Sequence, residues 1–149
     1  MEDGPEFFYQ VKGDMLLKTV QPREAQGALS HASSGGWARD AVDFVDVHIR
    51  EGEMFMLPPG IPHNPCRFAD TVGLVVERER REGELDHLRW YCMNGGEGNE
   101  ETRCGAIVND ETFFCTDLGS QLKPVIEAYY ASEEKRTCPK CGTVQAIPQ

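Results

Sequence analysis

The first half of the chain consists of short apolar runs separated by turn residues, a pattern typical of β-strands rather than of helices. The runs rich in β-branched and aromatic residues are Glu6–Val11, Asp14–Val20, Val42–Ile49, Glu53–Leu57 and Thr71–Glu77. The first two runs flank Gly13 and therefore predict a hairpin, and the next two flank Glu51-Gly52. Short strands at this spacing, with turns rich in Gly and Pro, predict an all-β barrel or sandwich.

The second half of the chain has a different pattern. The charged run Arg78–His87 predicts a solvated loop, and Leu88–Cys92 predicts a short strand. The Gly- and Glu-rich segment 93–103 predicts a flexible insertion. In Ser120–Ser132 the apolar residues recur at helical spacing, and Pro124 is expected in about the first turn, where proline is tolerated.

Length and charge narrow the class of protein. A chain of 149 residues with 40% hydrophobic residues is typical of one globular domain, with room for a small appendage. The net charge of −10 excludes a general nucleic-acid binder, which needs clustered Lys and Arg. No apolar run reaches the roughly 18–20 residues of a membrane span, and residues 1–6 are acidic, unlike an export signal. We therefore expect a cytoplasmic protein whose six cysteines are reduced.

The strongest local motif is Cys138-Pro-Lys-Cys141-Gly142, because two thiolates at this spacing can reach one metal ion. A tetrahedral site needs two further ligands. Cys92 and Cys104 are the best candidates, although a wide Gly-rich segment separates them. Cys115 is the alternative ligand, and Cys66 is expected to be an ordinary thiol.

A second motif places a histidine directly after a rigid proline loop, Leu57-Pro-Pro-Gly-Ile-Pro-His63-Asn-Pro65. A stiff backbone presets the direction of the imidazole, which suits metal ligation. Glu6, at the start of the strand Glu-Phe-Phe-Tyr-Gln-Val-Lys-Gly13, offers a carboxylate. A carboxylate from an early strand and a histidine from a later one predict a cupin barrel with a His/His/Glu metal site.

Several stretches together closely resemble the 3-hydroxyanthranilate 3,4-dioxygenase family, small cupins of the kynurenine route to quinolinate and NAD. The stretches are Glu6–Gly13, Gly52–Pro65, Arg67–Glu77, Leu88–Cys92, Thr116–Pro124 and Tyr130–Cys141. The combination of Glu-Phe-Phe-Tyr-Gln, Pro-His-Asn-Pro, Val-Val-Glu-Arg and Trp-Tyr-Cys is very specific. The cysteine motif resembles the bacterial and fungal type, which carries a second, rubredoxin-like iron site.

The resemblance implies a fold, a division of the chain and a reaction. The fold is a cupin-type double-stranded β-helix, or jelly roll, with a C-terminal helix and a cysteine-ligated metal tail. Residues 1–91 would form the barrel, with 22–41 as a flexible insertion, and residues 92–149 the extension with the four-cysteine site. The reaction is Fe(II)-dependent opening of the ring of 3-hydroxyanthranilate by O2, which gives 2-amino-3-carboxymuconate semialdehyde. The resemblance is compatible with a homodimer.

The resemblance also implies the residue roles. Glu6 and His63 would be catalytic iron ligands, and Glu6, Arg67 and Glu77 would contact substrate. Arg67 suits a carboxylate through its planar fork, and Glu77 suits the amine and hydroxyl and the acceptance of a proton. A second iron, or zinc, would be held by Cys92, Cys104, Cys138 and Cys141.

The chain departs from the family pattern at its start. The family places another histidine ligand six positions before the glutamate, which here falls immediately before Met1. His31, His48 and His87 are poor substitutes because of their predicted positions. We therefore expect Met1 to be an internal methionine and the 149-residue chain to be a poor enzyme as it stands.

Two other classes of function remain open on the sequence alone. One is a non-catalytic or inactive cupin that binds a small carboxylate or a metal, which the absent histidine favours. The other is an interaction module in which the cysteine site docks a partner and the barrel is a scaffold.

Overall fold

The computed structural model describes residues 4–22, 42–95 and 103–147. These residues form two compact units, which are taken separately below. The first unit comprises residues 4–21 and 43–84, and the second comprises 85–95 and 103–147. The strand-end residues Pro22 and Val42 are grouped with the second unit. The predicted boundary after residue 91 remains a prediction.

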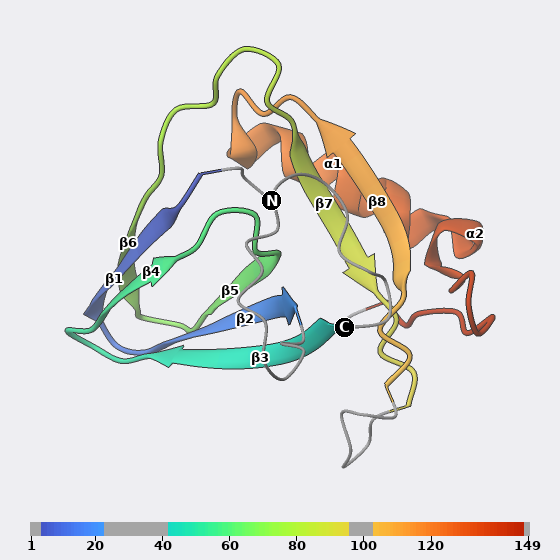
Figure 1. The fold of residues 1–149 in the computed structure, drawn as a ribbon, viewed down its shortest axis with the longest axis horizontal. Coiled ribbons are helices and arrows are strands. Elements are labelled where there is room, and N and C mark those ends of the chain that lie inside the picture. Colours follow the sequence, from blue (N-terminus) through green and yellow to red (C-terminus); the bar gives the residue numbers. More distant parts are fainter. Residues whose placement is uncertain (1–3, 23–41, 96–102, 148–149) are drawn as a thin grey trace. The chain divides into compact units, whose positions relative to one another are not determined.

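The first unit contains two three-stranded sheets (Figure 1). One has the strand order β4-β1-β6 and the other β3-β2-β5. The strands are β1 (Glu6–Lys12), β2 (Met15–Pro22), β3 (Val42–Ile49), β4 (Met54–Leu57), β5 (His63–Arg67) and β6 (Val72–Val76). The predicted strands are therefore confirmed within a few residues, and so is the all-β class.

The predicted hairpin around Gly13 is wrong. β1 pairs with β4 and β6, whereas β2 pairs with β5 and lies beside β3. Gly13 has a positive φ of 66° and turns the chain out of one sheet and into the other. The turn at Glu51-Gly52 likewise joins strands of different sheets, β3 and β4. Local turn signals locate the ends of these strands but do not determine their partners.

The core of the first unit receives side chains from both sheets. Its buried residues are Phe8, Met15, Leu17, Ile49 and Leu57. In β1 the burial alternates strictly, so that Glu6, Phe8 and Gln10 face inward. Two polar residues therefore lie on the buried face of a strand, on either side of a core phenylalanine.

The opposite face of the β4-β1-β6 sheet is apolar and exposed. Met54 and Met56 of β4 and Val72, Leu74 and Val76 of β6 are each at least half exposed. The register aligns them across β1, as in the Tyr9–Leu74 pair. Nothing in the described residues covers these side chains.

The second unit is a hairpin with a helix along one face (Figure 1). Its elements are β7 (Asp86–Tyr91), β8 (Ile107–Phe113), α1 (Leu118–Ala131) and α2 (Glu133–Arg136). Trp90 of β7 stacks on Tyr129 of α1, with ring centroids 4.1 Å apart. This contact attaches the helix to the hairpin.

The predicted helix is confirmed with small changes. It begins two residues earlier than expected, because the Asp117 side chain accepts a hydrogen bond from the amide of Gly119 as an N-cap. Pro124 lies in the second turn rather than the first, so one hydrogen bond inside the helix is absent. β8 has no counterpart among the predicted elements.

Two expectations lie largely outside the described residues. Of the predicted insertion at 22–41, Pro22 belongs to β2, and residues 23–41 are not described. Residues 96–102 of the predicted insertion are also not described. Within the described residues, no helix is long and apolar enough to span a membrane.

We expect Leu17→Ala to lower the free energy of unfolding by roughly 2–5 kcal/mol, because it opens a cavity where the side chain is fully buried. Leu74→Ala is the matched control, since Leu74 is half exposed on the outer face and should cost less than about 0.5 kcal/mol. Urea unfolding measures both values. Equal losses would contradict the assignment of inner and outer faces.

Candidate functional site

Glu6 and His63 meet inside the first unit. Nε2 of His63 lies 3.1 Å from Oε2 of Glu6, and both side chains are almost entirely buried. Glu6 is the first residue of β1, and His63 is the first residue of β5, directly after the proline loop. The two predicted metal ligands therefore lie side by side, although they come from different sheets.

The second ring nitrogen of His63 determines which nitrogen is available to a metal. Nδ1 lies 3.0 Å from the carbonyl oxygen of Ile61, which can only accept, so Nδ1 carries a hydrogen. Nε2 then remains as the coordinating nitrogen. Burial alone would lower the pKa of His63, but the hydrogen bonds to Glu6 and Ile61 outweigh it and raise the pKa above 6.5.

Arg67 lies on the same face of β5 as His63, and its side chain is exposed at the end of the strand. In the register of β2 with β5, His63 is opposite Thr19 and Arg67 is opposite Met15, and both partners are buried. The Arg67 guanidinium and the Gln10 side-chain oxygen lie over the bare backbone of Gly73, so closely that a Cβ there would stand 2.4 Å and 2.5 Å from them. An arginine fork beside buried polar atoms can hold a carboxylate.

Glu77 follows β6 and forms an ion pair, with its Oε2 3.0 Å from Nη1 of Arg80. The three histidines that were judged poor substitutes for a metal ligand lie elsewhere. His48 is exposed in β3, His87 lies in β7, and His31 is outside the described residues. Among the described residues, no third Asp, Glu, His or Cys completes a metal cluster with Glu6 and His63.

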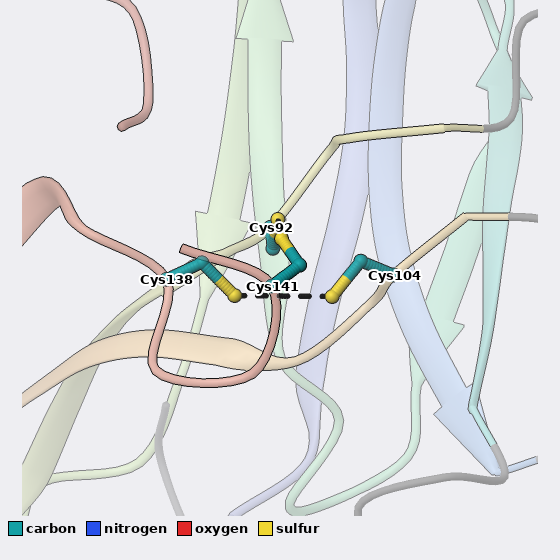
Figure 2. Close-up of side chains that lie close together, drawn as sticks. All are labelled: Cys92, Cys104, Cys138 and Cys141. Carbon is teal, nitrogen blue, oxygen red and sulfur yellow. Dashed lines mark hydrogen bonds between the residues drawn. The ribbon is translucent and has the colours of Figure 1, made fainter. Parts of the chain in front are cut away.

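The second unit contains the four-cysteine cluster (Figure 2). The sulfur atoms of Cys92, Cys104, Cys138 and Cys141 all lie within 4.8 Å of one another. Cys92 approaches Cys141 to 3.6 Å, and Cys104 approaches Cys138 to 3.8 Å. A tetrahedron with metal–sulfur bonds of about 2.3 Å has edges of about 3.8 Å. The four residues therefore fit a tetrahedral ion, and the predicted grouping is confirmed.

Backbone hydrogen bonds bring the distant pair together. The amide of Cys92 donates to Ala106, and the amide of Gly105 donates back to Cys92, so the β7–β8 ladder continues up to the cysteines. The second pair is held by a tight loop in which the Gly142 amide donates to Cys138 and the Cys138 amide donates to Thr143. The predicted alternative, Cys115, is buried but lies outside the cluster.

The thiols differ in how readily they ionise. Burial and the neighbouring thiols raise the pKa of Cys92 to about 12 and also raise that of Cys104. A hydrogen bond with the Thr143 hydroxyl helps to lower the pKa of Cys141 to about 6. Metal binding requires the thiolate form, so Cys141 is the cysteine of these three that is most readily ionised for it.

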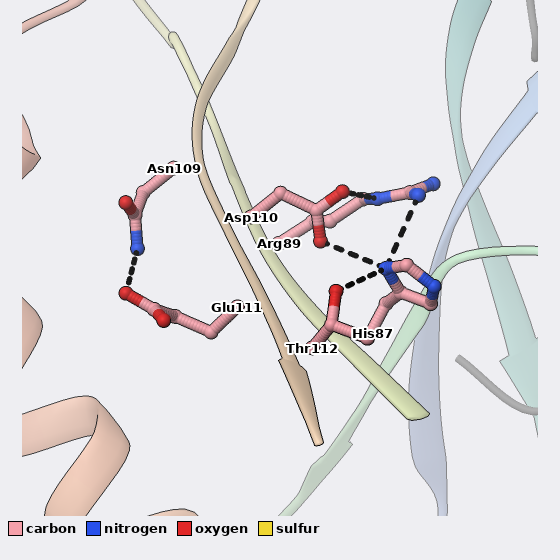
Figure 3. Close-up of polar contacts among 6 residues, drawn as sticks. All are labelled: His87, Arg89, Asn109, Asp110, Glu111 and Thr112. Atoms are coloured by element: carbon pink, nitrogen blue, oxygen red, sulfur yellow. Dashed lines mark hydrogen bonds and ion pairs between the residues drawn. The ribbon is translucent and has the colours of Figure 1, made fainter. Parts of the chain in front are cut away.

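The open face of the β7–β8 hairpin carries an ionic cluster (Figure 3). Nδ1 of His87 lies 3.0 Å from Oδ1 of Asp110, and Nε of Arg89 donates to Oδ2 of the same carboxylate at 2.8 Å. Thr112 also reaches His87, at 3.2 Å. On the other face of the hairpin, Glu111 pairs with Lys135 of α2 at 2.7 Å. These contacts place charged residues in a strand that the sequence did not indicate.

Sequence reasoning did not identify several residues beside the candidate ligands. The alternation along β1 could have indicated Gln10, which faces inward four residues after Glu6. No sequence signal indicated Gly73 or Gln145, because a lone glycine or amide carries no motif. Gln145 reaches the cysteine cluster, where its Nε2 donates to Cys92 Sγ at 3.3 Å.

The fold and these residues define a small cupin-type β-protein with a buried histidine–carboxylate pair and a separate four-cysteine cluster. The sequence model of the 3-hydroxyanthranilic acid dioxygenase family matches residues 1–130. The chain belongs to this family. Cys138 and Cys141 lie beyond the matched segment.

Curated relatives agree with this assignment. The chain is 49% identical over 142 residues to 3-hydroxyanthranilate 3,4-dioxygenase of Podospora anserina, covering 95% of this chain and 63% of the relative. It is 45% identical to the enzyme of that name from Neurospora crassa, covering 94% of this chain and 62% of the relative. For 3-hydroxyanthranilate 3,4-dioxygenase 2 of Aspergillus oryzae the identity is 46%, with 93% and 65% covered. The chain thus spans less than two thirds of the length of these relatives.

We expect Cys138→Ser to lose the metal of the cysteine cluster, so that metal content falls from about one ion per cluster to near zero. The melting temperature should fall with it, because few apolar contacts hold the C-terminal tail. Elemental analysis and calorimetry measure the two effects. Cys66→Ser is the control, since Cys66 lies in β5 outside the cluster and should retain the metal. Full metal content in C138S would contradict the assignment.

We expect the contribution of Asp110 to stability to depend on pH. Burial alone would raise its pKa, but hydrogen bonds from His87 and Arg89 outweigh it and lower the pKa below 3.8. The contribution is therefore fully present above the unfolded pKa of about 3.9 and is lost as the pH falls through the lower folded value. Urea unfolding should show a larger cost of Asp110→Asn at about pH 5 than at about pH 2. Asp46→Asn, at an exposed position of β3, is the control, and a constant cost of D110N across this range would contradict the prediction.

Proposed function

We propose that this chain carries the active site of a 3-hydroxyanthranilate 3,4-dioxygenase, with Fe(II) held by Glu6 and His63. The observation that carries the proposal is their buried contact of 3.1 Å within the segment that matches the family. In the reaction the ring bond between C3 and C4 breaks, and both atoms of O2 enter the product, 2-amino-3-carboxymuconate semialdehyde. No further oxidant or reductant is needed.

A bound Fe(II) ion would supply open coordination positions for a chelating substrate and for dioxygen. The residues of the chain have separate tasks. Glu6 and His63 hold the ion through one oxygen and one nitrogen, and the Ile61 carbonyl keeps the His63 ring in the correct tautomer. Phe8, edge-on to the His63 ring at 6.0 Å, excludes water from the side of the core.

Two further residues act on the substrate in this proposal. Arg67 binds the carboxylate of 3-hydroxyanthranilate through its guanidinium, which lies over Gly73 together with the side-chain oxygen of the buried Gln10. Glu77 hydrogen-bonds the amine and hydroxyl and accepts the hydroxyl proton. Its ion pair with Arg80 orients the carboxylate.

The four-cysteine cluster is proposed to hold a second iron or zinc ion. The sulfur separations support either metal, because both accept four thiolates in a tetrahedron. With all four coordination positions filled by protein, the ion has no place for substrate. Its role in this proposal is to join the C-terminal tail to the β7–β8 hairpin.

The setting of the reaction follows from the substrate. The proposal places the protein in the kynurenine route to quinolinate and NAD, acting on a small molecule and O2 and on neither nucleic acid nor membranes. A reducing, cytoplasmic location is part of the proposal, because cysteines that hold a metal must stay reduced. A homodimer is compatible with the exposed apolar face of the β4-β1-β6 sheet.

An inactive cupin that binds a carboxylate or a metal without turnover is the alternative. One observation favours it: among the described residues, Glu6 and His63 are two candidate ligands without a third. Oxygen uptake separates it from the proposed enzyme.

We expect oxygen uptake that depends on both Fe(II) and 3-hydroxyanthranilate, with one O2 consumed per substrate. An oxygen electrode and the absorbance of the ring-opened product measure it. The assay uses the 149-residue chain and a version extended by any residues encoded directly before Met1. No uptake by either version would overturn the enzyme proposal and support the inactive cupin.

His63→Ala should abolish uptake, whereas His48→Ala, at an exposed position of β3, should not.

Arg67→Lys keeps the charge but loses the planar fork, so it should raise KM roughly 10- to 100-fold with a smaller change in kcat. Arg50→Ala, on an exposed side chain, is the control for removing a cation. An unchanged KM in R67K would contradict the role of Arg67.

A further inference from the structure

Gln145 connects the C-terminal tail to the strand end that carries Cys92. Its side-chain Nε2 donates to Sγ of Cys92 at 3.3 Å, and its Oε1 accepts from the amide of Met93 at 3.1 Å. Because a backbone amide can only donate, the Met93 contact determines which end of the Gln145 amide is oxygen. The NH2 group therefore faces the sulfur.

The backbone of Gln145 is held as firmly as its side chain. Its amide donates to the carbonyl of Arg136 at 2.9 Å, and Nη1 of Arg136 donates to the Gln145 carbonyl at 2.7 Å. The residue follows the tight loop of Cys138 and Cys141 by only a few positions. Its position relative to Cys92 is therefore determined by the fold and not by the side chain alone.

We propose that Gln145 is a positioning residue of the four-cysteine metal centre, whose amide tunes the electron density on the Cys92 sulfur. The inference rests on the metal centre proposed above but not on the dioxygenase activity. A hydrogen bond to a thiolate ligand withdraws electron density and favours the more negative, reduced state of an iron centre. Removing the bond should lower the reduction potential.

Other polar side chains around the cluster make weaker substitutes. Nδ2 of Asn94 lies 3.8 Å from Cys141 Sγ, and the Thr143 hydroxyl lies 3.4 Å from the same sulfur. Cys141 is exposed, so water can replace a lost donor there. Cys92 is fully buried, so water cannot replace the donor from Gln145, and the backbone amide of Asn94 is then the donor that remains to this sulfur.

Gln121 provides a matched control in the same unit. Its Oε1 accepts from the amides of Thr116 and Asp117 at 2.7 Å and 2.9 Å, and its Nε2 donates to Phe114 at 3.1 Å. It bridges backbone groups as Gln145 does, but its hydrogen bonds involve no sulfur. Gln121→Leu should therefore lower stability and leave the metal centre unchanged.

The experiment loads the full chain with iron alone and measures the Fe(III)/Fe(II) midpoint potential by spectroelectrochemistry. Gln145→Leu should shift the equilibrium roughly tenfold toward Fe(III), about 59 mV for one electron. Gln145→Glu keeps an oxygen for Met93 but loses the donor, and it should also lower the potential. Both variants should release iron to a chelator about tenfold faster than the unaltered chain. Gln121→Leu should match the unaltered chain in both measurements, with a lower melting temperature.

Equal potentials in the unaltered chain, Q145L and Q145E would overturn the inference. An equal shift in Q121L would overturn it as well, because the effect would then be general loosening of the unit. Failure of the four cysteines to bind iron would also overturn it. If the oxygen assay shows no uptake but the potentials shift as expected, the dioxygenase proposal fails and this inference is still supported.

Discussion

The contact between Glu6 and His63 is the constraint on which the first unit depends. A carboxylate and an imidazole are buried together where the two sheets meet, and neither would be stable there without the other or a metal. The core residue Phe8 packs beside the pair, and the register of each sheet brings one of the two residues to the contact. A one-residue slip of β1 would turn Glu6 to the outer face and leave His63 buried without its partner. The buried pair therefore also specifies the register of the sheets.

Strands could be predicted from the sequence, but their partners could not. The apolar runs located β1, β3, β4 and β6 because alternation and turn residues act over a few positions. The pairing of β1 with β4 and β6 depends on contacts between distant parts of the chain, which no turn residue encodes. β8 was missed because Asp110 and Glu111 look like loop residues. Their charges are balanced by Arg89 and Lys135, which become neighbours only in the folded chain.

The candidate sites divide in the same way. Cys138 and Cys141 could be found from spacing, and His63 from its proline loop, because in each case the local backbone presets the ligand. The family resemblance then added Arg67 and Glu77. Gly73 has no side chain and so leaves room for the Arg67 guanidinium. Gln145 acts through a hydrogen bond to the sulfur of Cys92. Residues that support a ligand become visible only when their neighbours are known.

The way Cys92 and Cys104 are brought together has a consequence for how this part of the chain can vary. Three backbone hydrogen bonds close the base of the intervening segment: Cys92 to Ala106, Gly105 to Cys92, and Cys104 to Asn94. The sulfur positions are thus set below the segment, whatever number of residues it contains. Each doubling of such a loop costs only about 0.6 kcal/mol in closure entropy. A peptide inserted between Asn94 and Cys104 should therefore leave the positions of the four sulfur atoms unchanged.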